Sequence, residues 1–261
     1  MTAMARLTTL LVAMWLGVTV STVVDLEKRI IRGHECEADE RLYHVQLKST
    51  NGTHVSKCGG SLISNRWILT AAHCYKPGRN VTAHIGVHAG TLQIVRITDR
   101  PVIYINNNQQ HDLMLLKLPE AVGITPVPLP DCKHPPNISA VVQIAGHAST
   151  KVGPNNAKQR GSSDTLQCAD MDVIDCETYI SDLREKFKKF YEEKKHEHWI
   201  CTRRPLVDAC CGDSGGGVVY KDKIYGVISH GDTHVAVDPL ASSDLCYEPY
   251  LNWIRATIAR P

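Results

Sequence analysis

The chain has 261 residues, of which 43% are hydrophobic and 21% are charged, and its formal net charge at pH 7 is +2. These are the values of an ordinary globular protein, and the length allows one large domain or two small ones. The nearly balanced charge gives no sign of a nucleic-acid, membrane or acidic partner, and we expect no nucleic-acid binding.

Residues 1–22 are predicted to be a signal peptide. Arg6 is followed by an uncharged apolar run over residues 7–24, as in export signals. The run approaches spanning length, so a signal anchor is the competing interpretation. Ten cysteines and three Asn-X-Ser/Thr sequons fit an oxidising secretory compartment. We therefore predict a secreted, extracellular protein without stable membrane insertion, exported directly or stored in secretory granules. The candidate glycosylation sites are Asn51, Asn80 and Asn137.

Beyond residue 30, short apolar or alternating runs are separated by turn residues, a pattern that favours an all-β barrel or sandwich. A proline-rich stretch at 126–136 is interpreted as a crossover between two halves. Helical spacing of apolar residues predicts one helix over residues 179–198 and a C-terminal helix over residues 250–259. Examples of the predicted strands are 43–47, 67–70, 93–97, 113–118, 141–145, 217–220 and 223–229.

Three separated motifs supply an imidazole, a carboxylate and a hydroxyl in that chain order. They are Ala71-Ala72-His73-Cys74, the stretch that begins His111-Asp112-Leu113, and Gly212-Asp213-Ser214-Gly215-Gly216. A serine hydroxyl is a poor nucleophile at neutral pH unless an oriented base takes its proton. The order His, Asp, Ser is one of three unrelated orders known for the same catalytic geometry.

With these motifs, residues 30–261 resemble the chymotrypsin/trypsin-like serine protease family. The resemblance implies two antiparallel six-stranded β-barrels, roughly residues 30–135 and 136–248, then a C-terminal helix at 249–261. The active site would lie in the cleft between the barrels, with no cofactor. It also implies that His73 is the general base and acid, that Asp112 orients it, and that Ser214 attacks the scissile carbonyl. The backbone N–H groups of Gly212 and Ser214 would form the oxyanion hole.

The family likeness extends to an activation junction at Arg29–Ile30, with residues 23–29 as a short activation peptide. A cut after Arg29 would free the Ile30 amine. The resulting ammonium would pair with the Asp213 carboxylate and order the oxyanion loop, because a buried charge is costly unless it is paired.

The resemblance places Asp208 at the floor of the primary specificity pocket, where a carboxylate favours Arg or Lys in the substrate. Ser229 and Gly231 match the strand that pairs with the substrate backbone. No glycine follows Gly231, and Leu240, Ala241 or Ser242 takes the place of a second wall glycine. His147 and His230 stand where relatives usually carry tryptophan. These departures put the Arg/Lys preference in doubt and leave the reaction class intact.

The resemblance implies four disulfides and leaves Cys210 and Cys211 over. For these two a strained vicinal bridge, two free thiols or a mixed disulfide all remain open. The implied pairs are Cys36–Cys168, Cys58–Cys74, Cys132–Cys246 and Cys176–Cys201.

The lysines of residues 186–195 allow an exosite for an acidic partner, but glutamates between them favour a solvated helix face. The pairs His196 and His198, and His84 and His88, are interpreted as surface residues, because no cluster of thiolates or carboxylates accompanies them. We expect no metal site, and no calcium site in particular, because no glutamate occurs between Cys74 and Leu118.

The sequence therefore predicts a secreted serine endopeptidase, made as a zymogen and cutting after Arg or Lys. One alternative is a catalytically weak or silent protease-fold binding protein. Another is an endopeptidase of non-tryptic specificity. The expected partners are protein or peptide substrates and protein protease inhibitors, and the expected state is a monomer.

Overall fold

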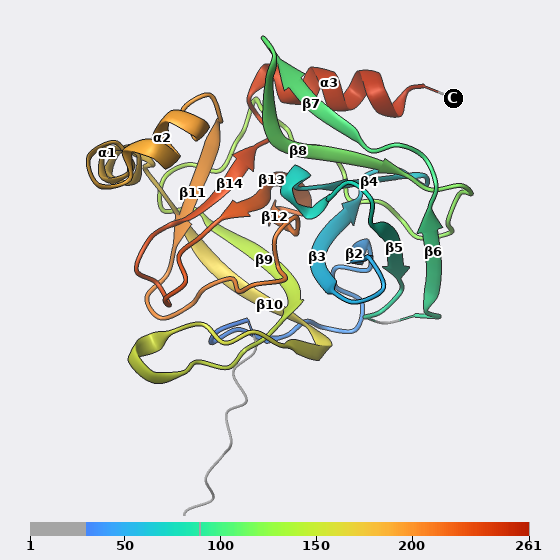
Figure 1. Cartoon of the computed structure of the whole chain (residues 1–261), viewed down its shortest axis with the longest axis horizontal. Coiled ribbons are helices and arrows are strands. Elements are labelled where there is room, and N and C mark those ends of the chain that lie inside the picture. The colour runs from blue at the N-terminus through green and yellow to red at the C-terminus, as the bar shows by residue number, and fades with distance from the viewer. Residues whose placement is uncertain (1–29, 89, 261) are drawn as a thin grey trace, which may run out of the picture.

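A computed structural model describes residues 30–88 and 90–260 (Figure 1). The predicted signal peptide and activation peptide lie outside these residues. The fold consists of two antiparallel sheets, one built from the first half of the chain and one mainly from the second. This confirms the prediction of an all-β fold with two halves. No helix among the described residues is long and apolar enough to cross a membrane.

The first sheet has seven strands in the order β6-β5-β2-β3-β4-β8-β7. Its end strands, β6 and β7, form no ladder with each other among the described residues, so this half departs from the predicted closed barrel. Pro101, which precedes β7, has no N–H to donate to such a ladder. The strands are β2 (His44–Thr50), β3 (Val55–Leu62), β4 (Trp67–Thr70), β5 (Asn80–Ile85), β6 (Gln93–Ile97), β7 (Val102–Asn106) and β8 (Gln109–Lys117).

The second sheet closes into a six-stranded barrel, because β9 pairs with both β12 and β10. The short strand β1 adds to β10 outside this ring. The strands are β1 (His34–Glu35), β9 (Val141–Ala148), β10 (Ser162–Ile174), β11 (Trp199–Arg203), β12 (Gly217–Tyr220), β13 (Lys223–His230) and β14 (Leu240–Asp244).

Each half buries its own apolar core, as expected for strands with one apolar face. Ile68, Leu113 and Leu115 lie in the first core, and Ile144 and Val218 lie in the second. The C-terminal helix α3 (Glu248–Ile258) is confirmed. It places Tyr250 and Ile254 in the core of the first half, so the end of the chain ties the two halves together (Figure 1).

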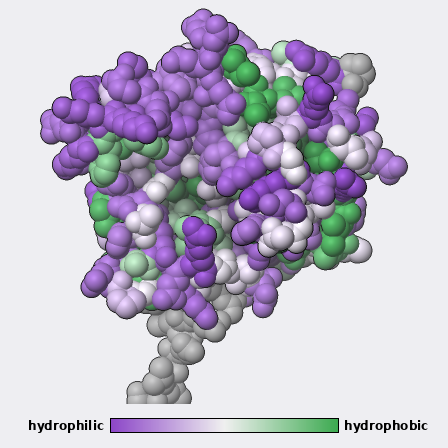
Figure 2. All heavy atoms as spheres, in the orientation of Figure 1, coloured by the Kyte–Doolittle hydropathy of each residue, from purple (hydrophilic) through white to green (hydrophobic). Residues whose placement is uncertain are grey.

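The single helix predicted over residues 179–198 is two helices, α1 (Glu177–Lys186) and α2 (Lys188–Lys194). Phe187 separates them at φ −126° and ψ 49°, which is not helical. The Cys176–Cys201 disulfide ties both ends of the excursion to the barrel, so the chain has to turn back within it. In Figure 2 this corner of the surface is almost entirely hydrophilic. Lys186 pairs with Asp182 and Lys195 with Glu192, which favours a solvated helix face over an exosite.

All four disulfides that the resemblance implied are present in the structure. Cys58–Cys74 joins β3 to the short 3-10 helix η1 (Ala72–Cys74). Cys132–Cys246 holds the crossover between the halves against the segment that leads into α3. Cys210 and Cys211 are free thiols, the first buried and the second exposed.

Candidate active site

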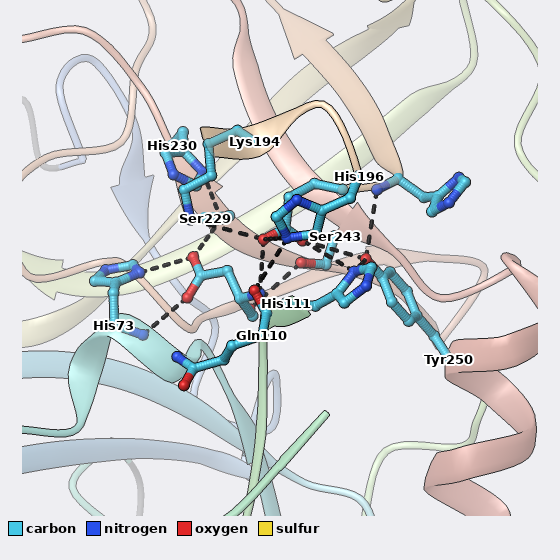
Figure 3. A network of polar contacts seen from close by, with 12 residues as sticks. His73, Gln110, His111, Lys194, His196, Ser229, His230, Ser243 and Tyr250 are labelled. Atoms are coloured by element: carbon cyan, nitrogen blue, oxygen red, sulfur yellow. Dashed lines mark hydrogen bonds and ion pairs between the residues drawn. The ribbon is translucent and has the colours of Figure 1, made fainter. Parts of the chain in front are cut away.

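His73 and Asp112 are brought together at one end of the first sheet. Figure 3 shows the network of polar contacts that includes His73, Ser229 and Tyr250. His73 lies on η1, directly after β4, and Asp112 lies on β8, which pairs with β4. The Nδ1 atom of His73 is 2.8 Å from Oδ2 of Asp112. The His73 backbone N–H also donates to Oδ1 of the same carboxylate, at 2.8 Å. The carboxylate therefore fixes both the main chain and the ring of His73.

Asp112 is buried, with a side chain 2% exposed, whereas the His73 side chain is 43% exposed. Burial acts to raise the pKa of Asp112. The hydrogen bonds from His73 and Ser229 outweigh this effect and hold the pKa below its ordinary value. The pair therefore presents an ionised carboxylate beneath an imidazole that solvent and ligands can reach.

A hydrogen-bonded chain from the second half reaches the same carboxylate. The hydroxyl of Ser229, at the end of β13, donates to Oδ2 of Asp112. Since that proton is used, the Nδ1 atom of His230 must donate to the Ser229 oxygen, at 2.5 Å. Burial lowers the pKa of His230 to about 4, so this ring is neutral at pH 7. Ser229, which was predicted to bind the substrate backbone, thus also supports Asp112.

Ser214 lies in the turn between residue 210 and β12, next to η1. Its carbonyl oxygen accepts a hydrogen bond from the Gly59 N–H at 2.7 Å and lies 3.7 Å from Sγ of Cys74, the neighbour of His73. Gly215 fits here because a Cβ would lie 2.2 Å from Oγ1 of Thr70, and its φ is +83°. In the described part of the chain, no hydrogen bond joins the Ser214 hydroxyl to His73. Such bonds are often long in unliganded sites.

The backbone N–H groups of Gly212 and Ser214 have no acceptor among the described residues. Their neighbours do: the Asp213 N–H donates to the Cys210 carbonyl at 3.0 Å, and the Gly215 N–H donates to the Ile228 carbonyl at 2.7 Å. Gly212 has φ +128°, a conformation that L side chains rarely adopt. Two free donors on either side of Asp213 form an arrangement that can bind an oxyanion.

Asp213 is fully buried beneath this loop. Its carboxylate accepts hydrogen bonds from the backbone N–H groups of Ala148 and Cys210, each at 2.9 Å. Gly146 leaves room for it, because a Cβ at Gly146 would lie 1.9 Å from Oδ1 of Asp213. Burial raises the pKa of Asp213 to about 6. No cation among residues 30–88 and 90–260 forms an ion pair with this carboxylate, although the Lys158 ammonium opposes the rise of its pKa.

The raised pKa of Asp213 predicts that the uncut chain loses stability as the pH rises from about 4 to about 6. In that interval the folded chain binds a proton that the unfolded chain releases, so stability is greatest below the unfolded pKa. A shift of about 2 pH units corresponds to about 3 kcal/mol. The free energy of unfolding, measured with denaturant at pH 4 and at pH 7, should fall more between these two values in the wild type than in Asp213→Asn, which lacks the titrating group. A difference between the two proteins that does not change with pH would contradict the prediction.

Glu197, which sequence reasoning missed, holds the backbone of Asp112 in place. Its side chain is buried, and Oε1 accepts a hydrogen bond from the Asp112 backbone N–H at 2.9 Å. The Tyr250 hydroxyl donates to Oε2 at 3.2 Å. Burial acts to raise the pKa of Glu197, but His111 and Lys194 hold it below its ordinary value. Its position in a run of lysines and glutamates made it look solvent-exposed.

Among the described residues, His111, His196 and Glu197 form one group whose donor atoms lie close enough for a metal ion. These atoms already have protein partners. Nδ1 of His111 is 2.6 Å from the Tyr250 hydroxyl, and Nε2 of His196 is 3.0 Å from the Gln110 carbonyl. We therefore assign no metal-binding role to the group.

Asp208, which the resemblance placed at the floor of the primary specificity pocket, is buried and already paired. Oδ2 of Asp208 is 2.8 Å from Nζ of Lys158, and both side chains are 3% exposed. The Ala236 N–H donates to the same oxygen at 2.8 Å. Burial raises the pKa of Asp208, and the Lys158 ammonium opposes that rise. Of the three candidate wall residues, Leu240 reaches the pocket, since its Cδ1 would lie 3.3 Å from a Cβ at Gly231.

Comparisons with known proteins agree with this geometry. Residues 30–254 match the family model described as Trypsin. The chain is 32% identical to the trypsin of Sus scrofa, across 90% of this chain and 98% of that protein. It is 31% identical to serine protease 1 of Rattus norvegicus, across 96% and 98%. Neuropsin, a serine protease of mouse brain, is a structural neighbour at 25% identity with a TM-score of 0.67, covering 87% of this chain and 98% of that one.

Proposed function

Because the chain belongs to the trypsin family of serine proteases, we propose that it is a serine endopeptidase whose catalytic residues are His73, Asp112 and Ser214. The observation that carries this proposal is the His73–Asp112 pair beside Ser214, whose own N–H and that of Gly212 have no acceptor among the described residues. The second-half residue Ser229 hydrogen-bonds to first-half Asp112, which keeps the two halves in register at the site.

In the proposed reaction His73 takes the proton of Ser214 as its oxygen attacks the substrate carbonyl. Asp112 holds the Nδ1–H tautomer, so Nε2 is free to accept that proton. The N–H groups of Gly212 and Ser214 stabilise the oxyanion, and one such donor is worth about 3 kcal/mol of barrier. His73 then protonates the leaving amine, and water activated by His73 hydrolyses the acyl ester on Ser214.

We also propose that cleavage after Arg29 activates the protein. Ile30 and Ile31 are buried against Ala209 and Cys210, the segment that leads into the oxyanion loop. Ile30 has φ +36°, which is strained for a β-branched residue by about 1–3 kcal/mol. Hydrolysis of the Arg29–Ile30 bond removes this constraint and frees an ammonium that can pair with Asp213.

A fluorophosphonate probe is expected to label Ser214 in the chain cut after Arg29, at a rate at least tenfold higher than in the uncut chain. The reason is that a paired Asp213 orders the two oxyanion donors. Labelling followed by mass spectrometry checks the result, with Ser214→Ala as the unlabelled control. Absence of labelling in the folded, cut chain would contradict the proposed catalysis and favour the alternative of a silent binding protein.

One observation favours a different specificity over the expected preference for Arg or Lys. Lys158 already occupies Asp208, so an endopeptidase of non-tryptic specificity fits the pocket better. In either case, protein or peptide substrates and protein inhibitors are the proposed partners. Secretion, glycosylation and a monomeric state remain predictions. Asn51, Asn80 and Asn137 are exposed, as glycan attachment requires.

A further inference from the structure

The cavity beside Ser214 is small, and a lysine lines it. It has a volume of about 90 Å³, and its lining includes Lys158, Ser214, Ile228 and Leu240. Asp232 also lines it, and its carboxylate already accepts hydrogen bonds from the Thr233 and His234 N–H groups. Asp208 is absent from that lining. A side chain that enters the cavity would therefore meet the Lys158 ammonium before it met the Asp208 carboxylate.

The position of Lys158 is fixed by its backbone. Its N–H donates to the Thr233 carbonyl at 2.9 Å, and the preceding Ala157 forms a β-bridge with His234. The same segment continues to Ala236, whose N–H binds the Asp208 carboxylate. Lys158 is thus held between this segment and Asp208.

The ion pair leaves Asp208 with little capacity for a second cation. One oxygen of Asp208 already accepts both the ammonium and the Ala236 N–H. A substrate arginine or lysine that reached Asp208 would bring a second positive charge to a buried carboxylate that one ammonium already neutralises. An unpaired buried charge is strongly unfavourable. Basic side chains are therefore excluded from Asp208 unless Lys158 leaves.

The Lys158 ammonium also has N–H donors that Asp208 does not use. An ammonium carries three donors, and Asp208 is the acceptor that the structure shows for it among the described residues. The neighbouring walls of Ile228 and Leu240 offer no acceptor. A substrate side chain that ends in a carbonyl or carboxylate oxygen would supply one.

We propose that Lys158 determines the specificity of this pocket by replacing the substrate's basic group at Asp208, so that the pocket takes glutamine or glutamate on the acyl side of the scissile bond (P1). The inference rests on the proposed endopeptidase function and names its substrate class. The group that recognises P1 is the Lys158 ammonium, in a small cavity whose lining also includes the apolar side chains of Ile228 and Leu240.

The first test uses p-aminobenzamidine, a fluorescent amidinium that binds a free carboxylate in such a pocket and needs no catalysis. The proteins are cut after Arg29. The wild type should bind it at least tenfold more weakly than Lys158→Met, and the double variant Lys158→Met/Asp208→Asn should lose the gain. Lys151→Met, at an exposed lysine of the same segment, should match the wild type. Equal amidine binding by wild type and Lys158→Met would overturn the proposal.

The second test measures kcat/KM on fluorogenic peptides that differ only at P1. The wild type should prefer Gln or Glu over Arg, Lys and norleucine by at least tenfold, and Lys158→Met should reverse the order toward Arg and Lys. The double variant leaves no charge at positions 158 and 208, so neither group is buried without its partner. It should lose the preference for Gln and Glu without gaining one for Arg and Lys. A wild-type preference for basic or norleucine P1 would overturn the proposal. The expected amidine pattern without cleavage of any peptide would instead overturn the proposed function and leave the role of Lys158 supported.

Discussion

Replacement of Asp112 by asparagine is expected to lower kcat about 10⁴-fold, the size of the effect of the same substitution in the type enzyme of the family. Asp112 accepts hydrogen bonds from the backbone N–H and the Nδ1–H of His73 and from the Ser229 hydroxyl. Asparagine keeps one acceptor oxygen and brings an NH₂ group. If that group faces Nδ1 of His73, the ring must carry its proton on Nε2. It then cannot take a proton from Ser214.

Steady-state hydrolysis of one peptide substrate, with active sites counted beforehand, checks this result. KM should change little, because Asp112 lies beneath His73 and away from the substrate. Asp99→Asn, at an exposed position, provides a matched control and should leave kcat unchanged. A kcat for Asp112→Asn within tenfold of the wild type would show that the His73–Asp112 pair is not part of the reaction.

The parts of the site that the sequence predicted are those carried by contiguous residues. Strands β4, β6 and β12 have the predicted ends, because turn residues bound each apolar run. His73, Asp112 and Ser214 each lie within a short motif, so each could be predicted as a catalytic residue without knowledge of the fold. The four disulfides followed from the family resemblance, and their positions agree with it.

The parts that the sequence did not predict depend on contacts between distant segments. Lys158 lies 50 positions before Asp208 in a polar loop, and nothing in that loop indicates that its side chain is buried. Glu197 is 85 positions from Asp112, in a charged run that local patterning assigns to the surface. The break at Phe187 is imposed by a disulfide that returns the chain to the barrel. The secondary-structure propensities of neighbouring residues contain no information about any of these long-range contacts.

Gly146 is a further case, and replacing it by alanine is expected to lower kcat/KM at least 10²-fold. The added Cβ would lie 1.9 Å from Oδ1 and 2.6 Å from Cγ of Asp213, so the carboxylate has to move. Asp213 is fixed by the N–H groups of Ala148 and Cys210 and stands between the two free donors of the oxyanion site. Loss of one oxyanion donor alone costs 10²–10³ in kcat.

The effect of Gly146→Ala should arise from space alone, because Gly146 does not have a positive φ. Gly123→Ala provides the matched control, since a Cβ there meets nothing within 4 Å. Both variants should be assayed well below their unfolding temperatures, so that any loss of stability does not reduce the folded fraction. His73 and Asp112 are untouched, so slow fluorophosphonate labelling of Ser214 would trace the loss to the oxyanion donors. A kcat/KM within threefold of the wild type would mean that these donors do not depend on the position of Asp213, and the proposed activation by the Ile30 ammonium would lose its physical basis.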